Sequence, residues 1–352
     1  MPKNAAEILN VAGKGLDTLP SAWLSTGSLR ELRAGFNRLR RIPAELSACT
    51  KLEALHLNHN LLGELPSSLR SCVSLRVLNL SANPLARFPE FIASLSNLET
   101  LNLRNTALEA VHPHFRAPAG LKLLSLAQNN ITAFPDGCFH PGGQLRVLDL
   151  SRNRLRLLPS LSNLREAREL DLSYNQLEHL PDDLCELENL EVLRLQGNRL
   201  QVLPAKISKL KRLRELWVQE NQIRALPESI TDLAELELLD VSDNRLSQLP
   251  QGLHRLKSLR RLVVSRNELI ELPATFTALR SLTFCSLTQN RLTDLPIATS
   301  ADALPALTVL LTAGNPFGSG WRPPAVYHYA LLPLDSPART RAPASQPLRI
   351  SS

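Results

Sequence analysis

Four residues have side chains that zinc binds and stand near one another in the sequence: His112, His114, Cys138 and His140. Zinc sites take three or four such ligands, usually in closely spaced pairs such as C-x₂-C or H-x₃-H. None of the four residues forms a pair with that spacing, and Cys138 occupies a position that leucine fills elsewhere in the chain. We therefore expect no metal site.

Other signatures of catalysis or cofactor binding are weak or missing. Ala12-Gly13-Lys14-Gly15 looks like part of a phosphate-binding loop but lacks the G-x₄-G-K-[ST] spacing. The sequence contains no G-x-S-x-G, no H-E-x-x-H and no set of kinase motifs. We expect a protein that is not an enzyme and takes no cofactor.

The cysteines and the N-terminus bear on cellular location. The five cysteines are scattered rather than clustered as in a disulfide framework. Cys49, Cys72, Cys138 and Cys285 replace leucine and are expected to pack in the core as small hydrophobic residues. The start, MPKNAAEILN, lacks the pattern of a signal peptide, and no apolar run approaches the ~20 residues that span a bilayer. These features predict a cytoplasmic protein without membrane insertion.

The elements that must position any site come from a repeat. An L-x-x-L-x-L block recurs every 23 residues, with steps of 24, 22 and 25 into Leu148, Leu170 and Leu310. Its second leucine, here called the anchor, stands at Leu9, Leu32, Leu55, Leu78, Leu101, Leu124, Leu148, Leu170, Leu193, Leu216, Leu239, Leu262, Cys285 and Leu310. Asparagine follows the anchor by five residues in twelve of fourteen repeats, and Lys14 and Thr106 replace it in the other two.

Segments such as LNLSAN and LDLSYN alternate like a short β-strand whose leucines face a core. One such strand cannot bury its apolar side alone, so neighbouring repeats must stack and share a core. The asparagine amide has donors and an acceptor, and we expect it to bond the backbone of its own turn and the adjacent one. Leu-Pro pairs such as Leu65-Pro66 are expected to begin the convex side.

This pattern resembles the leucine-rich repeat family in its 23-residue form, LxxLxLxxNxLxxLPxxLxxLxx, over residues 6 to about 320. Among members it looks most like intracellular Ras-associated scaffolds and their plant relatives. The resemblance implies an α/β leucine-rich-repeat solenoid, or horseshoe, with a concave parallel β-sheet and an irregular convex side with short helices. We expect this domain over residues 1–332, with a C-terminal cap at about 316–332, and a disordered Pro-rich basic tail at 333–352.

Basic residues exceed acidic ones, with a net charge of +7 and a pI near 9.4. Sixteen residues after successive anchors, Glu186, Lys209, Asp232 and Arg255 alternate in sign, so the basic run KISKLKRLR has acidic neighbours. A nucleic-acid-binding stripe needs charge of one sign, whereas an alternating column predicts exposed ion pairs. We therefore expect no nucleic-acid binding. An adaptor for nucleic acid or a membrane surface is kept only as a third alternative, after the two functions described below.

The best candidate surface is the concave face of the sheet. The residue after each anchor points away from the core, and nothing in the fold requires aromatic side chains there. Tyrosine, tryptophan and arginine dominate protein-binding hot spots. The predicted partner-binding residues are Asp149, Asp171, Tyr174, Arg194, Trp217, Glu220, Asp240 and Asp243. Because the rim is acidic, we expect a partner that presents basic and apolar groups.

We predict a monomeric, non-enzymatic intracellular scaffold or adaptor that binds a protein partner on its concave face, in signalling. The resemblance implies a small GTPase or a phosphatase or kinase subunit as the partner. The alternative is the substrate-recognition region of a larger enzyme, a ubiquitin ligase or a kinase. The segment LNLRNTALEAVHPHF at 101–115 departs from the pattern at Thr106. We interpret it as a joint between two halves of the array rather than as a site.

Overall fold

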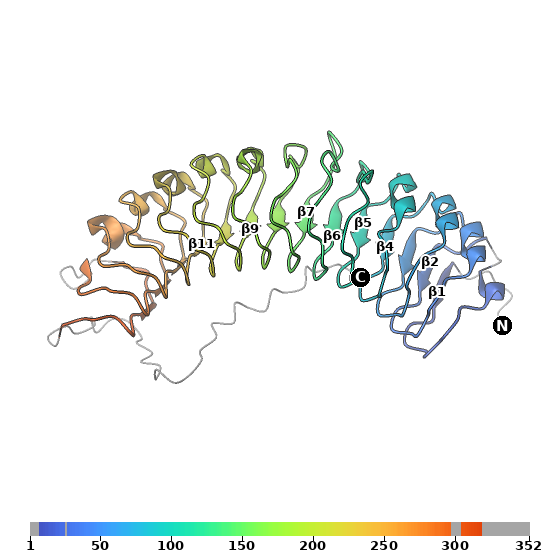
Figure 1. Ribbon diagram of the computed structural model, residues 1–352. Coiled ribbons are helices and arrows are strands. Elements are labelled where there is room, and N and C mark those ends of the chain that lie inside the picture. The colour runs from blue at the N-terminus through green and yellow to red at the C-terminus, as the bar shows by residue number, and fades with distance from the viewer. Residues whose placement is uncertain (1–6, 25–26, 297–303, 319–352) are drawn as a thin grey trace.

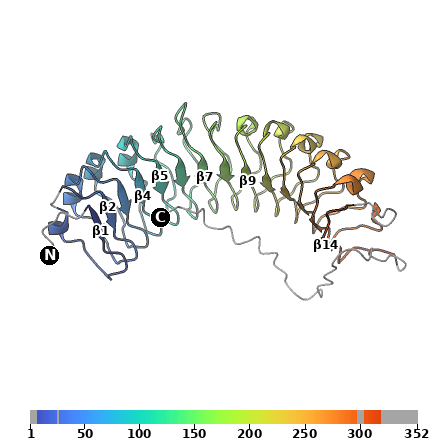
Figure 2. The same cartoon turned by 180° about the vertical axis from the view of Figure 1, so that it is seen from behind.

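The computed structural model describes residues 7–24, 27–296 and 304–318. Within these segments, fourteen strands of three residues each form one parallel sheet, and neighbours in the sequence are neighbours in the sheet (Figure 1). The strands are β1 (Ile8–Asn10), β2 (Glu31–Arg33), β3 (Ala54–His56), β4 (Val77–Asn79), β5 (Thr100–Asn102), β6 (Leu123–Ser125), β7 (Val147–Asp149), β8 (Glu169–Asp171), β9 (Val192–Arg194), β10 (Glu215–Trp217), β11 (Leu238–Asp240), β12 (Arg261–Val263), β13 (Phe284–Ser286) and β14 (Val309–Leu311). The sheet lines the inner side of a curved array, which confirms the predicted solenoid (Figure 2).

Short 3-10 helices line the outer rim of the arc, opposite the sheet (Figure 1). In the described segments they are η1 (Ser21–Trp23), η2 (Ala44–Ala48), η3 (Ser67–Ser71), η4 (Glu90–Ser94), η5 (Asp182–Glu186), η6 (Ile207–Lys209), η7 (Glu228–Asp232), η8 (Leu253–Arg255) and η9 (Ala274–Ala278). Seven of them directly follow a proline, as at Pro66 with φ −66° and Pro227 with φ −65°. Proline has this φ built in and donates no N–H, so it is suited to starting the convex segment.

The core is one continuous stack of leucines between the sheet and the outer rim. Each anchor is paired with the anchor of the next repeat, as in Leu193 with Leu216. Anchors from Leu32 to Leu310 are at most 1% exposed, whereas Leu9, at the open end of the stack, is only partly buried. All five cysteines are free and buried, and the prediction that Cys49, Cys72, Cys138 and Cys285 substitute for leucine in the core is confirmed.

The asparagines form the predicted ladder. The Asn198 side chain donates to the carbonyls of Leu195 in its own repeat and Leu172 in the preceding one, at 2.9 and 3.0 Å. Its Oδ1 accepts the N–H of Leu177 at 3.0 Å. One buried amide therefore satisfies backbone groups on two adjacent turns, each of which would cost ~1–3 kcal/mol if left unpaired.

Thr106 interrupts this ladder but not the sheet. Its hydroxyl donates to the Leu103 carbonyl at 2.8 Å and does not reach the preceding repeat. The N–H of Leu85, which an asparagine amide would bind, donates instead to the Asn83 carbonyl at 2.9 Å. Between η4 and η5 the chain forms no helix, so the irregular repeats differ on the convex side while their strands stay in register.

The predicted C-terminal elements lie mostly outside the described residues. Of the cap at 316–332, the structure describes residues 316–318, where Phe317 packs against the core. The rest of the cap and the tail at 333–352 lie outside these segments.

Candidate functional site

The eight residues predicted to bind a partner lie on five consecutive strands and the turns after them. Strands β7 to β11 place Asp149, Asp171, Arg194, Trp217 and Asp240 side by side, each in register with the next. Tyr174, Glu220 and Asp243 each stand three residues beyond the end of a strand. The fold therefore brings all eight onto one face, here called the concave site.

The three aspartates of the concave site have their carboxylates engaged within their own turns. Asp149, Asp171 and Asp240 each accept hydrogen bonds from the N–H and the hydroxyl of the serine two residues later, at 2.6 to 3.1 Å. Asp149 is 4% exposed and Asp240 is 9% exposed. Burial raises the pKa of Asp171, with a further rise from the charge of Asp149, and burial also raises the pKa of Asp240. These carboxylates stabilise turns, and those of Asp149 and Asp240 present little charge to solvent.

Arg194 and Trp217 are held by a shared acidic neighbour. The Arg194 guanidinium lies 3.7 Å from Glu169 and 3.9 Å from Glu215. The Trp217 indole N–H donates to the Glu215 carboxylate at 3.0 Å. Both side chains are half-buried. These contacts restrict their rotamers before any partner arrives, which lowers the entropic cost of binding.

Tyr174 lies over Gly197, which occupies the same position in the turn of the next repeat. An added Cβ on Gly197 would lie 2.5 Å from the Tyr174 ring, so only a hydrogen fits beneath it. The Arg152 guanidinium sits 4.5 Å from the ring centroid. Tyr174 remains 36% exposed, and burial raises the pKa of its hydroxyl. The ring is therefore packed on its surroundings, with part of its surface open to a partner.

The turn residues of the concave site adopt a left-handed backbone. The φ angles are 53° at Tyr174, 56° at Glu220 and 51° at Asp243. This conformation costs ~1–2 kcal/mol for a residue with a Cβ. It lets the N–H of Tyr174 donate to the Gln196 carbonyl, and that of Glu220 to the Ser242 carbonyl, which continues the ladder past the strands.

Several residues that shape the site were not predicted. Glu169 and Glu215 hold Arg194 and Trp217, while Arg152 and Gly197 pack against Tyr174. The recurring Asp-x-Ser order after the anchors was a readable signal, because aspartate often bonds the backbone two residues later. It would have identified the strand aspartates as turn-forming residues.

The N-terminal half of the concave side has a second aromatic feature. Phe36 and His59 stack with ring centroids 4.5 Å apart, and Phe36 is 60% exposed. His56 lies 3.6 Å from Glu31, and burial lowers its pKa. This pair comes from turns in the same column as Tyr174, so it offers a matched comparison for that residue.

A ladder of charge runs along the edge where the chain enters each strand, two residues before each anchor. From β1 to β12 the column reads Glu7, Arg30, Glu53, Arg76, Glu99, Lys122, Arg146, Arg168, Glu191, Arg214, Glu237 and Arg260. Ion pairs join neighbours in it, including Arg76–Glu99 at 3.4 Å and Arg168–Glu191 at 2.9 Å. The alternation fails only at Lys122, Arg146 and Arg168. On the convex side, by contrast, the predicted alternating column contributes the pair Asp232–Arg255.

The candidate zinc ligands do not form a metal site. In the described part of the chain, no group of three or more histidine, cysteine or acidic side chains is placed to hold a metal. Cys138 is buried, which raises the pKa of its thiol to about 12. His112 lies 3.3 Å from Glu90 instead. The residues lack the converging geometry that zinc needs.

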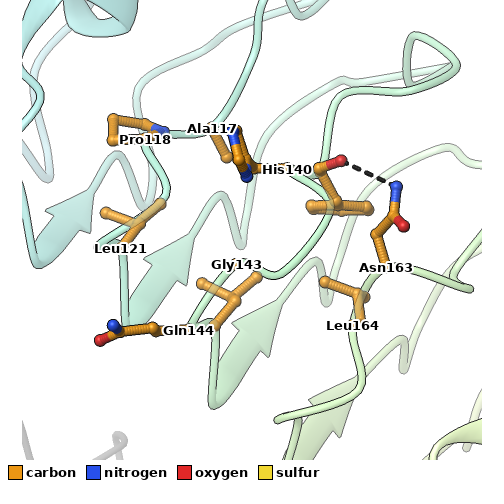
Figure 3. A pocket seen from close by; sticks show the side chains of 10 residues that line it. Ala117, Pro118, Leu121, His140, Gly143, Gln144, Asn163 and Leu164 are labelled. Atoms are coloured by element: carbon orange, nitrogen blue, oxygen red, sulfur yellow. Dashed lines mark hydrogen bonds between the residues drawn. The ribbon is translucent and has the colours of Figure 1, made fainter.

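The hollow near these residues is small. Figure 3 shows it between the irregular repeats, lined by Pro118, Leu121, His140 and Leu164, with Asn163 donating to the Phe139 carbonyl at 3.1 Å. It has about 10 Å³ of space for water-sized molecules, roughly enough for one water. Pockets for small molecules are far larger, at ~300–1,000 Å³. None of the helices in the described residues is long and apolar enough to cross a membrane.

Comparison with known proteins finds similar chains along most of the array. A leucine-rich repeat protein of Leptospira interrogans is 31% identical, with a TM-score of 0.81 over 87% of this chain and 77% of that one. The ectodomain of the Arabidopsis thaliana receptor kinase GASSHO1/SCHENGEN3, solved with CASPARIAN STRIP INTEGRITY FACTOR 2, is 30% identical, with a TM-score of 0.64 over 85% of this chain and 40% of that one.

Curated relatives match shorter stretches. Fibromodulin of Bos taurus is 41% identical over 86 residues, which are 24% of this chain and 22% of that protein. The chain thus matches about a fifth of the length of the fibromodulins.

The expected cytoplasmic location is wrong by these comparisons. The relatives and structural neighbours are mostly extracellular or secreted leucine-rich repeat proteins and receptor ectodomains. Scattered, buried cysteines misled the expectation, because a core that already buries this much leucine does not need disulfides to be stable.

The family model for the leucine rich repeat matches residues 27–85, 96–155, 119–177, 188–246 and 234–292. These ranges include β2 to β13 and every strand of the concave site. The chain belongs to the leucine-rich repeat family.

Proposed function

We propose that this chain binds a protein partner, presented as an extended peptide or loop, on the concave site, and that this binding serves signalling. The observation that carries the proposal is the pair of partly exposed aromatic rings, Tyr174 and Trp217, which lie two repeats apart with Arg194 on the repeat between them and are held in place by Arg152 and Glu215. Pre-organised aromatic side chains with an adjacent arginine are the usual centre of a binding hot spot.

The residues of the concave site take two roles in this proposal. Tyr174, Arg194, Trp217, Glu220 and Asp243 contact the partner, because each is at least partly exposed and, in the described part of the chain, none accepts hydrogen bonds from a serine of its own turn. The other three residues instead shape the turns, because their carboxylates accept hydrogen bonds from the serine two residues later: Asp149, Asp171 and Asp240. The partner therefore meets a less acidic surface than the sequence alone suggested.

Structural neighbours support a peptide partner. The titles of two of them name complexes of a peptide hormone receptor with RGF2 and of a receptor-kinase ectodomain with CASPARIAN STRIP INTEGRITY FACTOR 2, at 27% and 30% identity. The classes implied by the Ras-associated resemblance, a small GTPase or a phosphatase or kinase subunit, stay a prediction. The same holds for the 23-residue Leu-Pro subtype, for a monomeric state and for a domain boundary at 332.

A second candidate is the recognition region of a longer protein. The chain covers 40% of the receptor-kinase ectodomain chain and 4% of a mouse leucine-rich repeat serine/threonine-protein kinase. In that case the concave site keeps its binding role, and catalysis belongs to another domain.

Quantitative affinity purification with a double variant tests the proposal. Tyr174→Ala with Trp217→Ala is expected to remove captured partners, since hot-spot truncations cost ≥ ~2 kcal/mol each, or about 30-fold in affinity. Asp240 is left intact, because its buried carboxylate holds Ser242 and its loss would disturb the turn.

The matched control is Phe36→Ala with His59→Ala, which removes the stacked pair from the N-terminal half. This variant should keep the partners, and both variants should melt near the wild-type temperature. Unchanged capture by the Tyr174/Trp217 variant, or equal loss in both variants, would refute the proposal.

A further inference from the structure

We propose that one flank of the array binds an extended acidic peptide segment with a carboxylate at every third residue. The flank is the one onto which the chain turns as it leaves the strands β7 to β11. Its central feature is an arginine stripe, defined as Arg154, Arg199 and Arg245 with Arg156 and Arg224 beside them. The stripe is separate from the concave site, and its function does not depend on that of the concave site.

The spacing of the stripe is set by the backbone. Arg154, Arg199 and Arg245 each follow a ladder asparagine directly, and Gln176 and Gln222 occupy the same position in the repeats between them. The N–H of each such residue donates to a carbonyl of the preceding repeat, as Arg199 does to Leu177 and Arg245 does to Ile223, both at 2.9 Å. Repeats joined in this way are ~4.8 Å apart, so alternate repeats place the arginines ~9.6 Å apart.

The charge of the stripe is uncompensated. All five arginines are exposed, and none forms an ion pair or side-chain hydrogen bond in the described part of the chain. Arg76, Arg168 and Arg214 of the edge ladder, by contrast, have glutamate partners. Glu178 is the one acidic side chain within the stripe, next to Gln176. The column continues as Asn130 before Arg154 and as Glu268 after Arg245, so the stripe is five repeats long.

An extended peptide matches this geometry. A polyproline II segment has three residues per turn and rises ~3.1 Å per residue, so every third side chain lies on one face with a spacing of ~9.3 Å. Three carboxylates on such a face fall close to Arg154, Arg199 and Arg245 together. Arginine pairs well with carboxylates because its planar fork donates two parallel hydrogen bonds.

Apolar side chains favour a peptide over other polyanions. Leu157 and Val202 border the stripe and are 70% and 60% exposed. They offer apolar contacts to the side chains that stand between the carboxylates of a peptide. A sulfated polysaccharide has no such side chains between its charged groups. Single-stranded nucleic acids are usually held by aromatic side chains that stack on bases. The two columns that form the stripe contain no aromatic residue from Arg154 to Ser247.

Fluorescence anisotropy at about 20 mM salt tests the stripe, because charge pairs at a surface are least screened there. The probe is a labelled Asp-Pro-Pro-Asp-Pro-Pro-Asp peptide, and its isomer Pro-Pro-Asp-Asp-Asp-Pro-Pro has the same composition with the acids clustered. The full chain is compared with the triple variant Arg154→Gln/Arg199→Gln/Arg245→Gln. The charge-matched control is Lys206→Gln/Lys209→Gln/Lys211→Gln, in and around η6 on the convex side.

The expected result is binding of the spaced peptide that weakens about tenfold in the arginine variant. Affinity should change less than about twofold in the lysine control and in Trp217→Ala, and the clustered isomer should bind more weakly than the spaced peptide. No binding of the spaced peptide, equal affinity for the two isomers, or equal loss in the lysine control would overturn the proposal. Arginine-dependent binding of heparin or single-stranded DNA, tighter than that of the peptide, would overturn the assignment of the partner.

Discussion

Arg146→Glu should stabilise the protein by repairing the edge ladder. Arg146 is exposed and stands between Lys122 and Arg168, whose carboxylate partners, Glu99 and Glu191, are on their far sides. The backbone keeps these positions one repeat apart. The N–H of Arg146 donates to the Lys122 carbonyl, and the N–H of Arg168 donates to the Arg146 carbonyl, both at 2.8 Å. Glutamate at 146 would restore strict alternation.

The expected gain in the free energy of unfolding follows from the two charged neighbours of residue 146, Lys122 and Arg168. An exposed pair of opposite charges contributes ~0.2–1 kcal/mol, and like charges placed side by side cost a similar amount. The substitution replaces two like-charge contacts with two opposite-charge contacts, so the net gain should be about 1 kcal/mol. For a domain of this size, that raises the melting temperature by roughly 1–2 °C.

Arg214→Glu is the matched control, since it makes the same chemical change between Glu191 and Glu237. It should lower the melting temperature by a similar amount, because it removes the ion pair with Glu237 and places like charges beside Glu191 and Glu237. Calorimetry at low salt measures both variants, and the gap between them should shrink in about 1 M NaCl. Shifts of the same sign, or a gap that salt leaves unchanged, would refute the role of the ladder.

Four further changes test the turns by urea titration, and one of them, at Asp171, is also measured as a function of pH. Gly197→Ala should destabilise by about 1 kcal/mol or more, because the new Cβ meets the Tyr174 ring at a left-handed φ of 67°; an unchanged midpoint would contradict this. Ala107→Gly should stabilise by ~0.5–1 kcal/mol, since Ala107 has φ 59°, and a loss of stability would show that the angle is not strained. Thr106→Asn should stabilise slightly or not at all and leave partner capture intact, whereas lost capture would contradict its interpretation as a joint. Burial raises the folded-state pKa of Asp171 above its unfolded value, so the stability that its protonated form contributes falls as pH rises from about 4 through the raised pKa. Asp171→Asn should therefore gain on wild type as pH rises and converge with it below about pH 4, and a gap independent of pH would contradict the shift.

The fold was predictable because the same pattern of leucines and asparagines recurs in fourteen repeats. A leucine at the anchor has one way to be buried, so the period alone implied a stacked parallel sheet. The role of the asparagines was also predictable, because a polar amide next to a core must find backbone partners in adjacent turns. Thr106 was readable for the same reason, since a hydroxyl has a shorter reach and fewer donors.

Charge was harder to read from the sequence. Asp171 and Tyr174 were placed on the concave face correctly, but whether a carboxylate faces solvent or its own serine depends on the turn geometry. The edge ladder joins residues 22 to 24 positions apart, such as Arg168 and Glu191. The sequence analysis instead identified the alternating column sixteen residues after the anchors, on the convex side. Which columns face each other closely is decided by the stacking of repeats.

The sequence by itself determined the repeat, the core and the candidate face, because periodic burial leaves no other arrangement of so many leucines. Only the tertiary structure decided which charged groups are free. Coulomb and hydrogen-bond energies depend on separations of a few ångströms between repeats, and such distances exist only after stacking. That is why the aspartates proved to hold turns, while Arg154, Arg199 and Arg245 remained without partners in the described chain.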